Sequence, residues 1–287
     1  MRKLTSLSAI AVACIATTGA FARPANVNLN FNGSGNTLAA TGFDNAYNLN
    51  TAGFNVAGGR LSVTGLPGDT FGNYENDPDS AQNFFYSSID NLPQITVEAA
   101  VRVSGLNSNF EGGGIWLGTD TDHYIRLALF NNTFEGGIAV EALRENEDRW
   151  VNAVPPGPGE DIVGRVIPNI AASPQGADID AVLRLVRNGS TVQAFASING
   201  GAFQQVGGAG FTFTGFASPG DAQGNGSNTQ EAGGLKVGVY ALGGNSPTTT
   251  DAIFAFDSLT AVATPEPASL GLVALAGGLM FRRRRAM

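Results

Sequence analysis

Cysteine, histidine and lysine are scarce in this sequence of 287 residues, and each scarcity excludes a class of chemistry. The only cysteine is Cys14 and the only histidine is His123. A disulfide framework within the chain is therefore excluded, and so are zinc sites built from several cysteines and histidines. No Gly-x-Ser-x-Gly motif is present, which argues against a serine triad. His123 follows two aspartates and is predicted to be a turn residue that leads into a strand.

Sustained helical periodicity is also missing between the two ends of the chain. Instead, apolar residues alternate with polar or small ones over residues 95–103, 125–129, 192–196 and 235–239. That alternation predicts half-buried strands, and Gly, Asn and Pro separate them at the spacing typical of a β-sandwich. We expect residues 23–263 to form one all-β domain, a two-sheet antiparallel sandwich with fewer than about one residue in ten in helices.

The N-terminus has the pattern of a secretory signal peptide. Arg2 and Lys3 precede a mostly apolar stretch, and Ala20 and Ala22 fit an A-x-A cleavage site. We expect signal peptidase to remove residues 1–22 as a helical export signal. Cys14 lies inside that segment, so the exported protein would contain no cysteine.

The C-terminus, residues 264–287, has three elements in a fixed order. Pro265, Glu266 and Pro267 precede an apolar stretch over residues 268–281, and four arginines, Arg282, Arg283, Arg284 and Arg285, follow it. The prolines hold the chain extended, the apolar stretch can enter a bilayer as a short helix, and the arginines resist crossing it. This order resembles the PEP-CTERM sorting signal, which membrane proteases called exosortases recognise. The resemblance implies transient anchoring and final placement at the cell surface or outside the cell; a retained tail anchor is the alternative.

Excess negative charge characterises the chain between these two end segments. The full chain has 16 basic and 24 acidic residues, and six of the bases and one acid lie in the end segments. Residues 23–263 therefore carry 10 basic and 23 acidic residues, a net charge of −13, with Lys236 as the only lysine. Such a surface repels nucleic acid and anionic membranes and attracts divalent cations.

Several short motifs in the body are similar to those of a known fold family. A glycine-rich strand over residues 113–118 is followed by a hairpin strand over residues 120–127, then by residues 183–189 and by a final strand at residues 256–259. This succession resembles the concanavalin A-like jelly rolls, especially the domains appended to family 43 glycosidases and their laminin-G-like relatives. The resemblance implies a jelly-roll sandwich and leaves the activity open, because this fold carries lectins, hydrolases and spacers alike.

Paired catalytic carboxylates are not evident in the sequence. Jelly-roll glycosidases place them as Glu-x-Asp-x-x-Glu on one strand, and the nearest pattern here, at residues 75–80, lacks the final acid and contains Pro78. We therefore expect a non-enzymatic surface or extracellular-matrix protein with a carbohydrate-binding or adhesive role. The alternative is a glycan-active hydrolase with an atypical site, which would require two carboxylates about 5–10 Å apart.

Two kinds of binding site remain open. One structural Ca²⁺ is a candidate cofactor, with Asp257 on the last strand and Asp44 near the first as the ligands to test. For contact with a glycan, such as an extracellular polysaccharide, the candidates are Trp116, Trp150 and Tyr240, since aromatic side chains line sugar-binding faces.

Overall fold

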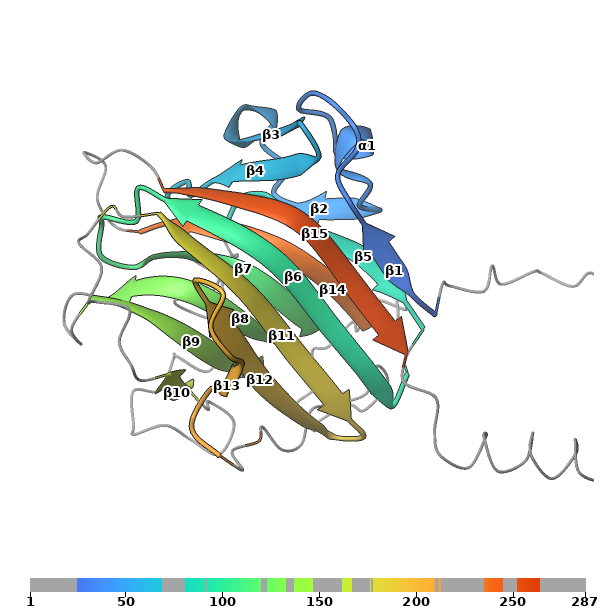
Figure 1. Cartoon of the computed structure of the whole chain (residues 1–287). Coiled ribbons are helices and arrows are strands. Elements are labelled where there is room, and N and C mark those ends of the chain that lie inside the picture. Colours follow the sequence, from blue (N-terminus) through green and yellow to red (C-terminus); the bar gives the residue numbers. More distant parts are fainter. Residues whose placement is uncertain are drawn as a thin grey trace, which may run out of the picture.

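The computed structural model describes residues 25–68, 81–90, 92–119, 123–132, 137–146, 162–166, 176, 178–209, 212, 235–244 and 252–263. Two antiparallel sheets stack face to face over this part of the chain (Figure 1). The described helices are short: a single turn at Leu38–Thr41 and a 3₁₀ turn at Thr51–Gly53.

The larger sheet has eight strands, in the order β13-β12-β11-β6-β15-β4-β3, with β1 also paired to β15. Their bounds are β1 Val27–Leu29, β3 Phe54–Ala57, β4 Arg60–Thr64, β6 Gln94–Ser104, β11 Ile179–Asn188, β12 Thr191–Ile198, β13 Gln204–Gln205 and β15 Ile253–Ala263. Because Val27 pairs with Ala261, the two ends of the described domain lie next to each other.

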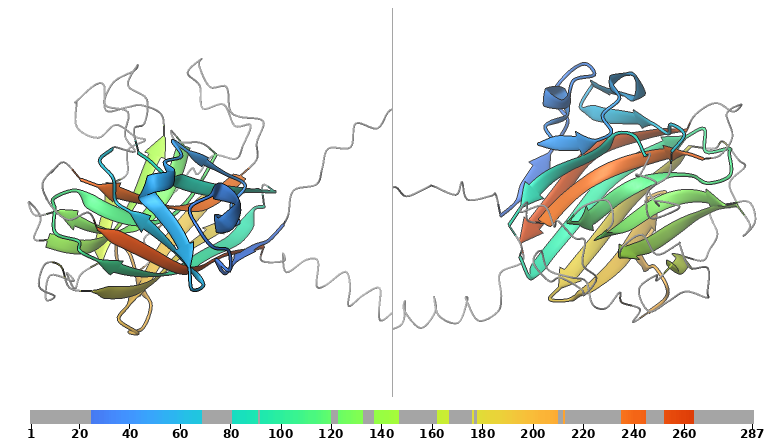
Figure 2. Two further views of the ribbon diagram at one scale, coloured as in Figure 1. Left: turned by 90° about the horizontal axis from the view of Figure 1, so that it is seen from above. Right: turned by 180° about the vertical axis from the view of Figure 1, so that it is seen from behind.

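The smaller sheet has seven strands, in the order β10-β9-β8-β7-β14-β5-β2. Their bounds are β2 Asn45–Tyr47, β5 Phe84–Ile89, β7 Glu111–Gly118, β8 His123–Asn132, β9 Gly137–Asn146, β10 Ile162–Val166 and β14 Leu235–Gly243. In the view from behind, β14, β7, β8 and β9 lie nearest to the viewer, and the face that they turn away from the other sheet points toward the viewer (Figure 2, right).

The strands form where the sequence alternates, and the core lies between the sheets. Along β6, buried and partly exposed residues alternate from Ile95 to Val103. The buried set from both sheets forms one large apolar cluster. Burial of this alternating surface is the main term that holds the two sheets together.

The predicted fold is confirmed: the described residues form a two-sheet antiparallel sandwich of the jelly-roll type. Three further predictions fall outside the described residues: the two terminal helices, the cleavage site at Ala20 and Ala22, and the sorting motif at residues 265–267 and 282–285. In the part of the chain that the structure describes, no helix is long and apolar enough to cross a bilayer.

Candidate functional site

The outer face of the seven-stranded sheet gathers side chains that strand alternation would normally send into solvent. In the register, Trp116 on β7 lies between Gly238 on β14 and Arg126 on β8. Neighbouring rows of the same face add Lys236 and Tyr240, each two residues from Gly238 along β14. All of these side chains are buried, although they point away from the other sheet.

Aromatic rings pack against one another across this face. The ring centroids of Phe84 and Trp116 are 4.6 Å apart, and those of Phe84 and Tyr240 are 5.0 Å apart. Tyr86 and Tyr124 meet the Trp116 ring edge-on at 6.0 and 6.4 Å. These distances are those of favourable aromatic pairs, so the rings form a second apolar cluster, separate from the core between the sheets.

Gly238 allows the Trp116 indole to lie close to β14. The indole nitrogen donates a hydrogen bond of 3.0 Å to the carbonyl oxygen of Phe85 on β5. A Cβ atom at position 238 would lie 2.6 Å from that nitrogen and 1.7 Å from the same carbonyl oxygen. Only glycine leaves room for this contact, and the indole is thereby fixed in place.

A buried ion pair lies beside the aromatic cluster. Nη2 of Arg126 is 3.3 Å from Oε1 of Glu141 on β9, and both side chains are almost fully buried. The Arg126 guanidinium also lies 5.9 Å from the centroid of the Tyr240 ring and 5.7 Å from that of Phe130. A buried ion pair is costly to desolvate, so its presence on this face is weak evidence for a contribution to stability.

The Tyr240 hydroxyl is fully buried and has no hydrogen-bond partner among the residues that the structure describes. Burial raises the pKa of Tyr240 well above its usual value, while the nearby Arg126 charge acts in the opposite direction. The phenol therefore keeps its proton and remains a hydrogen-bond donor at neutral pH. An unsatisfied buried donor is rare in native proteins and calls for a partner, such as a ligand oxygen.

Lys236 places an ammonium group on the same face. Its Nζ donates a hydrogen bond of 2.6 Å to the Tyr47 hydroxyl, and it lies 5.2 Å and 4.9 Å from the ring centroids of Tyr47 and Tyr86. The three residues come from β14, β2 and β5, so the contact also ties the edge strand β2 to the centre of the sheet.

Two of the three predicted glycan-contact residues meet at this face. Trp116 and Tyr240 belong to one cluster, whereas Trp150 lies outside the described residues. Sequence reasoning missed Arg126 and Glu141, because a charged residue at an outward position of an alternating strand is normally solvated. The only sequence feature that singles them out is weak: each is a charged residue within an otherwise apolar stretch.

The predicted calcium ligands have protein partners in the structure. Asp257 occupies a bulge of β15 and pairs with Arg60, and Asp44 accepts a hydrogen bond of 2.8 Å from the Ser88 amide. Over the described ranges, no group of three or more His, Cys, Asp or Glu residues could hold a metal ion. The calcium site remains a prediction.

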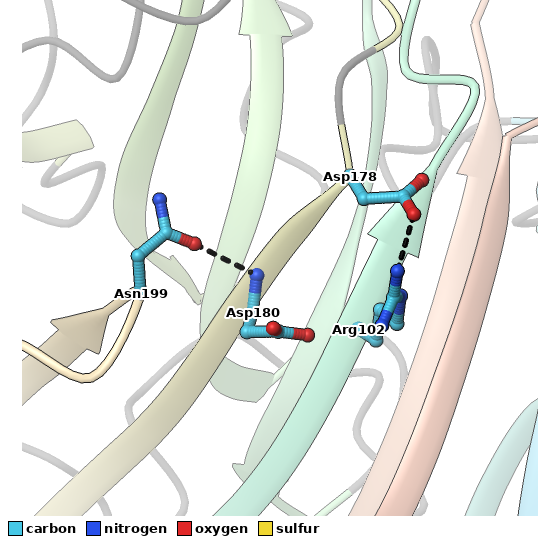
Figure 3. Close-up of polar contacts among 4 residues, drawn as sticks. All are labelled: Arg102, Asp178, Asp180 and Asn199. Atoms are coloured by element: carbon cyan, nitrogen blue, oxygen red, sulfur yellow. Dashed lines mark hydrogen bonds and ion pairs between the residues drawn. The ribbon is translucent and has the colours of Figure 1, made fainter.

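A further polar group lies where β6 and β11 pair on the eight-stranded sheet (Figure 3). Asp178 pairs with Arg102, and this hydrogen bond raises the pKa of Arg102. Asn199 accepts a hydrogen bond of 3.1 Å from the Asp180 amide and donates one of 2.7 Å to the Asp180 carbonyl. Asn199 therefore joins the end of β12 to β11. These polar contacts hold neighbouring strands together, which accounts for them structurally.

Comparison with solved structures finds similar folds within larger hydrolases. The chain is similar to the GH43 protein BlXynB from Bacillus licheniformis, with 17% identity and a TM-score of 0.53, over 76% of this chain and 36% of that one. A mutant of the same protein has 16% identity and a TM-score of 0.57, over 83% of this chain and 39% of that one. The GH43B protein of a Bacteroides ovatus xyloglucan locus has 14% identity and a TM-score of 0.50, over 75% of this chain and 35% of that one.

This chain thus spans less than two fifths of the length of those neighbours. No protein-family model matches the sequence, and comparison with curated proteins finds no match either. At such low identity, the likeness establishes the fold.

The comparisons correct the expected function. We expected a non-enzymatic surface or matrix protein with a carbohydrate-binding or adhesive role, and that expectation is wrong: the structural neighbours are mostly GH43 glycoside hydrolases. The sequence pattern tests for one arrangement of carboxylates on one strand, whereas the charged groups described on the outer face come from β8, β9 and β14.

Proposed function

We propose that this chain is a glycan-active hydrolase with an atypical site on the outer face of the seven-stranded sheet. The observation that carries the proposal is the group formed by Glu141, Arg126 and Tyr240. It combines a buried carboxylate, a guanidinium whose nitrogen lies 3.3 Å from it, and a buried phenol hydroxyl with no hydrogen-bond partner in the described part of the chain. The glycoside hydrolase neighbours support the same class of activity.

Each residue of the group has a role that follows from its chemistry. Glu141 serves as the acid–base group, since a positioned carboxylate is the group that glycoside hydrolysis requires. Arg126 orients that carboxylate through its ion pair. The Tyr240 hydroxyl donates a hydrogen bond to an oxygen of the bound sugar, and the Phe84 ring, 5.0 Å away between centroids, packs against the Tyr240 ring.

Hydrolysis with two carboxylates needs a partner for Glu141. Glu141 is the carboxylate whose side chain the structure describes on this face, and in the register of β8 with β9 Glu145 occupies a position on the same face, opposite Tyr124. The role of Glu141 is the part that the structure makes testable.

The test compares Glu141→Gln with a matched variant, Glu98→Gln. Glu98 forms a similar ion pair with Arg184 at 2.6 Å, but on the eight-stranded sheet and with its side chain 34% exposed. The full-length protein and both variants would be assayed for release of reducing ends from xylan, arabinoxylan and xyloglucan. Circular dichroism would establish that each variant is folded.

We expect Glu141→Gln to lower kcat by at least about 100-fold, the usual contribution of a general acid or base, and Glu98→Gln to leave it unchanged. Two results would contradict the proposal. One is the absence of turnover of any of these glycans by the wild-type protein, and the other is a folded Glu141→Gln variant with wild-type activity.

A further inference from the structure

We propose that the outer face of the eight-stranded sheet is the interface of a homodimer, in which a row of alternating charges pairs with the same row on a second copy of this chain. The proposal goes beyond the proposed function, because Glu141 and Tyr240 lie on the other sheet. Pairing of the two eight-stranded sheets would leave the outer faces of both seven-stranded sheets outside the interface.

The charge row crosses four neighbouring strands, β11, β6, β15 and β4, on the sheet that faces the viewer in Figure 1. Asp180 on β11 is opposite Arg102 on β6, and Asp178, just before β11, pairs with the same arginine (Figure 3). Asp257 lies at the bulge of β15 and pairs with Arg60 on β4. Across these strands the sign of the charge is therefore negative, positive, negative and positive.

Arg102 interacts with acidic residues on both of its sides, which makes the row continuous. Its hydrogen bond to Asp178 raises the pKa of Arg102, and the charges of Asp180 and Asp257 act in the same direction. Asp257 is thus within electrostatic reach of Arg102 as well as paired with Arg60.

The side chains of the charge row are accessible. Those of Arg60 and Asp257 are 50% and 45% exposed, and those of Arg102 and Asp178 are 46% and 50% exposed. Arg60 uses its Nε and Arg102 one Nη2 for these pairs, so further N–H groups of each guanidinium remain for a second partner. A single exposed ion pair contributes little, whereas a network of several charges contributes more.

The order of the signs makes the row complementary to itself. A two-fold axis between β6 and β15 would place Arg102 opposite Asp257 of the second copy, and Arg60 opposite Asp178 and Asp180 of the second copy. Every one of these contacts joins opposite charges. A polyanion such as an acidic glycan would instead meet three carboxylates beside two arginines, so the pattern favours a second copy.

The charge of the whole molecule also points to this face. The chain has a net charge of −8, so two copies repel each other at long range. Among the basic side chains whose burial the structure describes, the two exposed ones are Arg60 and Arg102. Both belong to the charge row, which is therefore where two acidic copies can approach.

The face is large enough and flat enough for a stable dimer. Beside the charge row, Ala100, Val182 and Ala255 face outward in the register, and such small side chains let two sheets pack at about 10 Å. Strands β12, β11, β6 and β15 have 8, 10, 11 and 11 residues. At about 3.4 Å per residue and 4.8 Å per strand they cover about 650 Å². Two copies would bury about 1,300 Å², within the range of specific interfaces.

Reversing single charges tests this pairing. Sedimentation equilibrium of the full-length protein would be measured from about 0.01 to 100 µM, the span of affinities at such interfaces. The variants are Arg102→Asp and Asp257→Arg, alone and mixed in equal amounts. In a homodimer each variant would place like charges opposite each other twice, whereas the mixed dimer has opposite charges at every position. Asp90→Arg is the control, because Asp90 is exposed and directly follows β5 of the other sheet.

We expect the wild-type protein and Asp90→Arg to reach twice the monomer mass of 29.5 kDa. Each reversal in the charge row should weaken self-association at least about 10-fold, because like charges face each other. The mixture of the two variants should form dimers again. Circular dichroism would establish that each variant is folded, and Arg60→Asp, with the same expected weakening, would replace a variant that is not.

Three results would overturn the proposal. One is a wild-type protein that stays monomeric over the whole concentration range. Another is self-association that neither reversal weakens, as expected if the apolar C-terminal segment held the copies together. The third is a mixture of the two folded variants that remains monomeric.

Discussion

Tyr240 is the residue that most directly marks the candidate site, because its buried hydroxyl has no hydrogen-bond partner over the described ranges. Removing a group that the native fold leaves unsatisfied should not weaken the fold. We expect Tyr240→Phe to keep or raise the free energy of unfolding, by up to about 1 kcal/mol, and to lower affinity for the bound glycan about tenfold. Urea unfolding and calorimetry measure the two effects. A loss of more than about 1 kcal/mol of stability would mean that the hydroxyl has a structural partner.

The same hydroxyl predicts a pH dependence of stability in alkali. Burial raises the pKa of Tyr240, so above pH 10 the unfolded chain loses this proton while the native state retains it. The free energy of unfolding should therefore be unaffected by this group below pH 10. Above pH 10 it should decrease by up to about 1.4 kcal/mol per pH unit from this group alone. Tyr240→Phe should show the shallower decline in urea titrations from pH 8 to 11.5; parallel declines would contradict the assignment.

Part of the candidate site could be predicted residue by residue from the sequence. Trp116 and Tyr240 could be selected because aromatic residues in an alternating strand are candidates for a sugar-binding face. Arg126, Glu141 and Lys236 could not, because alternation gives the face on which a residue lies and not whether that face is covered. The pairing of Arg126 with Glu141 depends on the register of β8 with β9, which alternation does not specify.

At the scale of the element, β14 owes its position to one glycine. A methyl group at Gly238 would lie 1.7 Å from the Phe85 carbonyl oxygen and 2.6 Å from the Trp116 indole nitrogen. Neither the β5–β14 backbone pairing nor the buried indole can shift easily to make room. We expect Gly238→Ala to lower the free energy of unfolding by about 3 kcal/mol, and to shift the tryptophan fluorescence.

Gly201→Ala provides the control for this substitution. A Cβ atom there would meet one contact, the Ile198 carbonyl oxygen at 3.1 Å, in a turn at the end of a hairpin. The expected loss is below about 1 kcal/mol. Equal stability of the two variants would show that β14 adjusts without the Trp116 contact.

The strands themselves were largely predictable. The alternation over residues 95–103 lies within β6 (Gln94–Ser104), and that over residues 235–239 lies within β14. The order of the strands in the sheets was not predictable from alternation, because β6 pairs with β11 and β15, which are distant in sequence. Only the resemblance to jelly-roll domains indicated that arrangement.

At the scale of the whole molecule, the expected processing of both ends would leave a chain with a net charge of −13 over residues 23–263. Like charges on a compact fold repel one another, so added salt should raise the melting temperature by screening them. A specific calcium site would add a separate effect, because an ion that binds only the native state stabilises it by mass action.

Melting in CaCl₂ and in NaCl of equal ionic strength separates the two effects. If a site exists, saturation at about 100 times Kd should add about 2.7 kcal/mol, which raises the melting temperature by at least a few degrees beyond the salt effect. Asp257→Ala should remove that excess, and Asp178→Ala should not. The two aspartates are matched, since each forms an exposed ion pair with an arginine on the eight-stranded sheet and their side chains are 45% and 50% exposed. Coincident melting curves in the two salts would exclude calcium, and loss of the excess in both variants would place the ion away from Asp257.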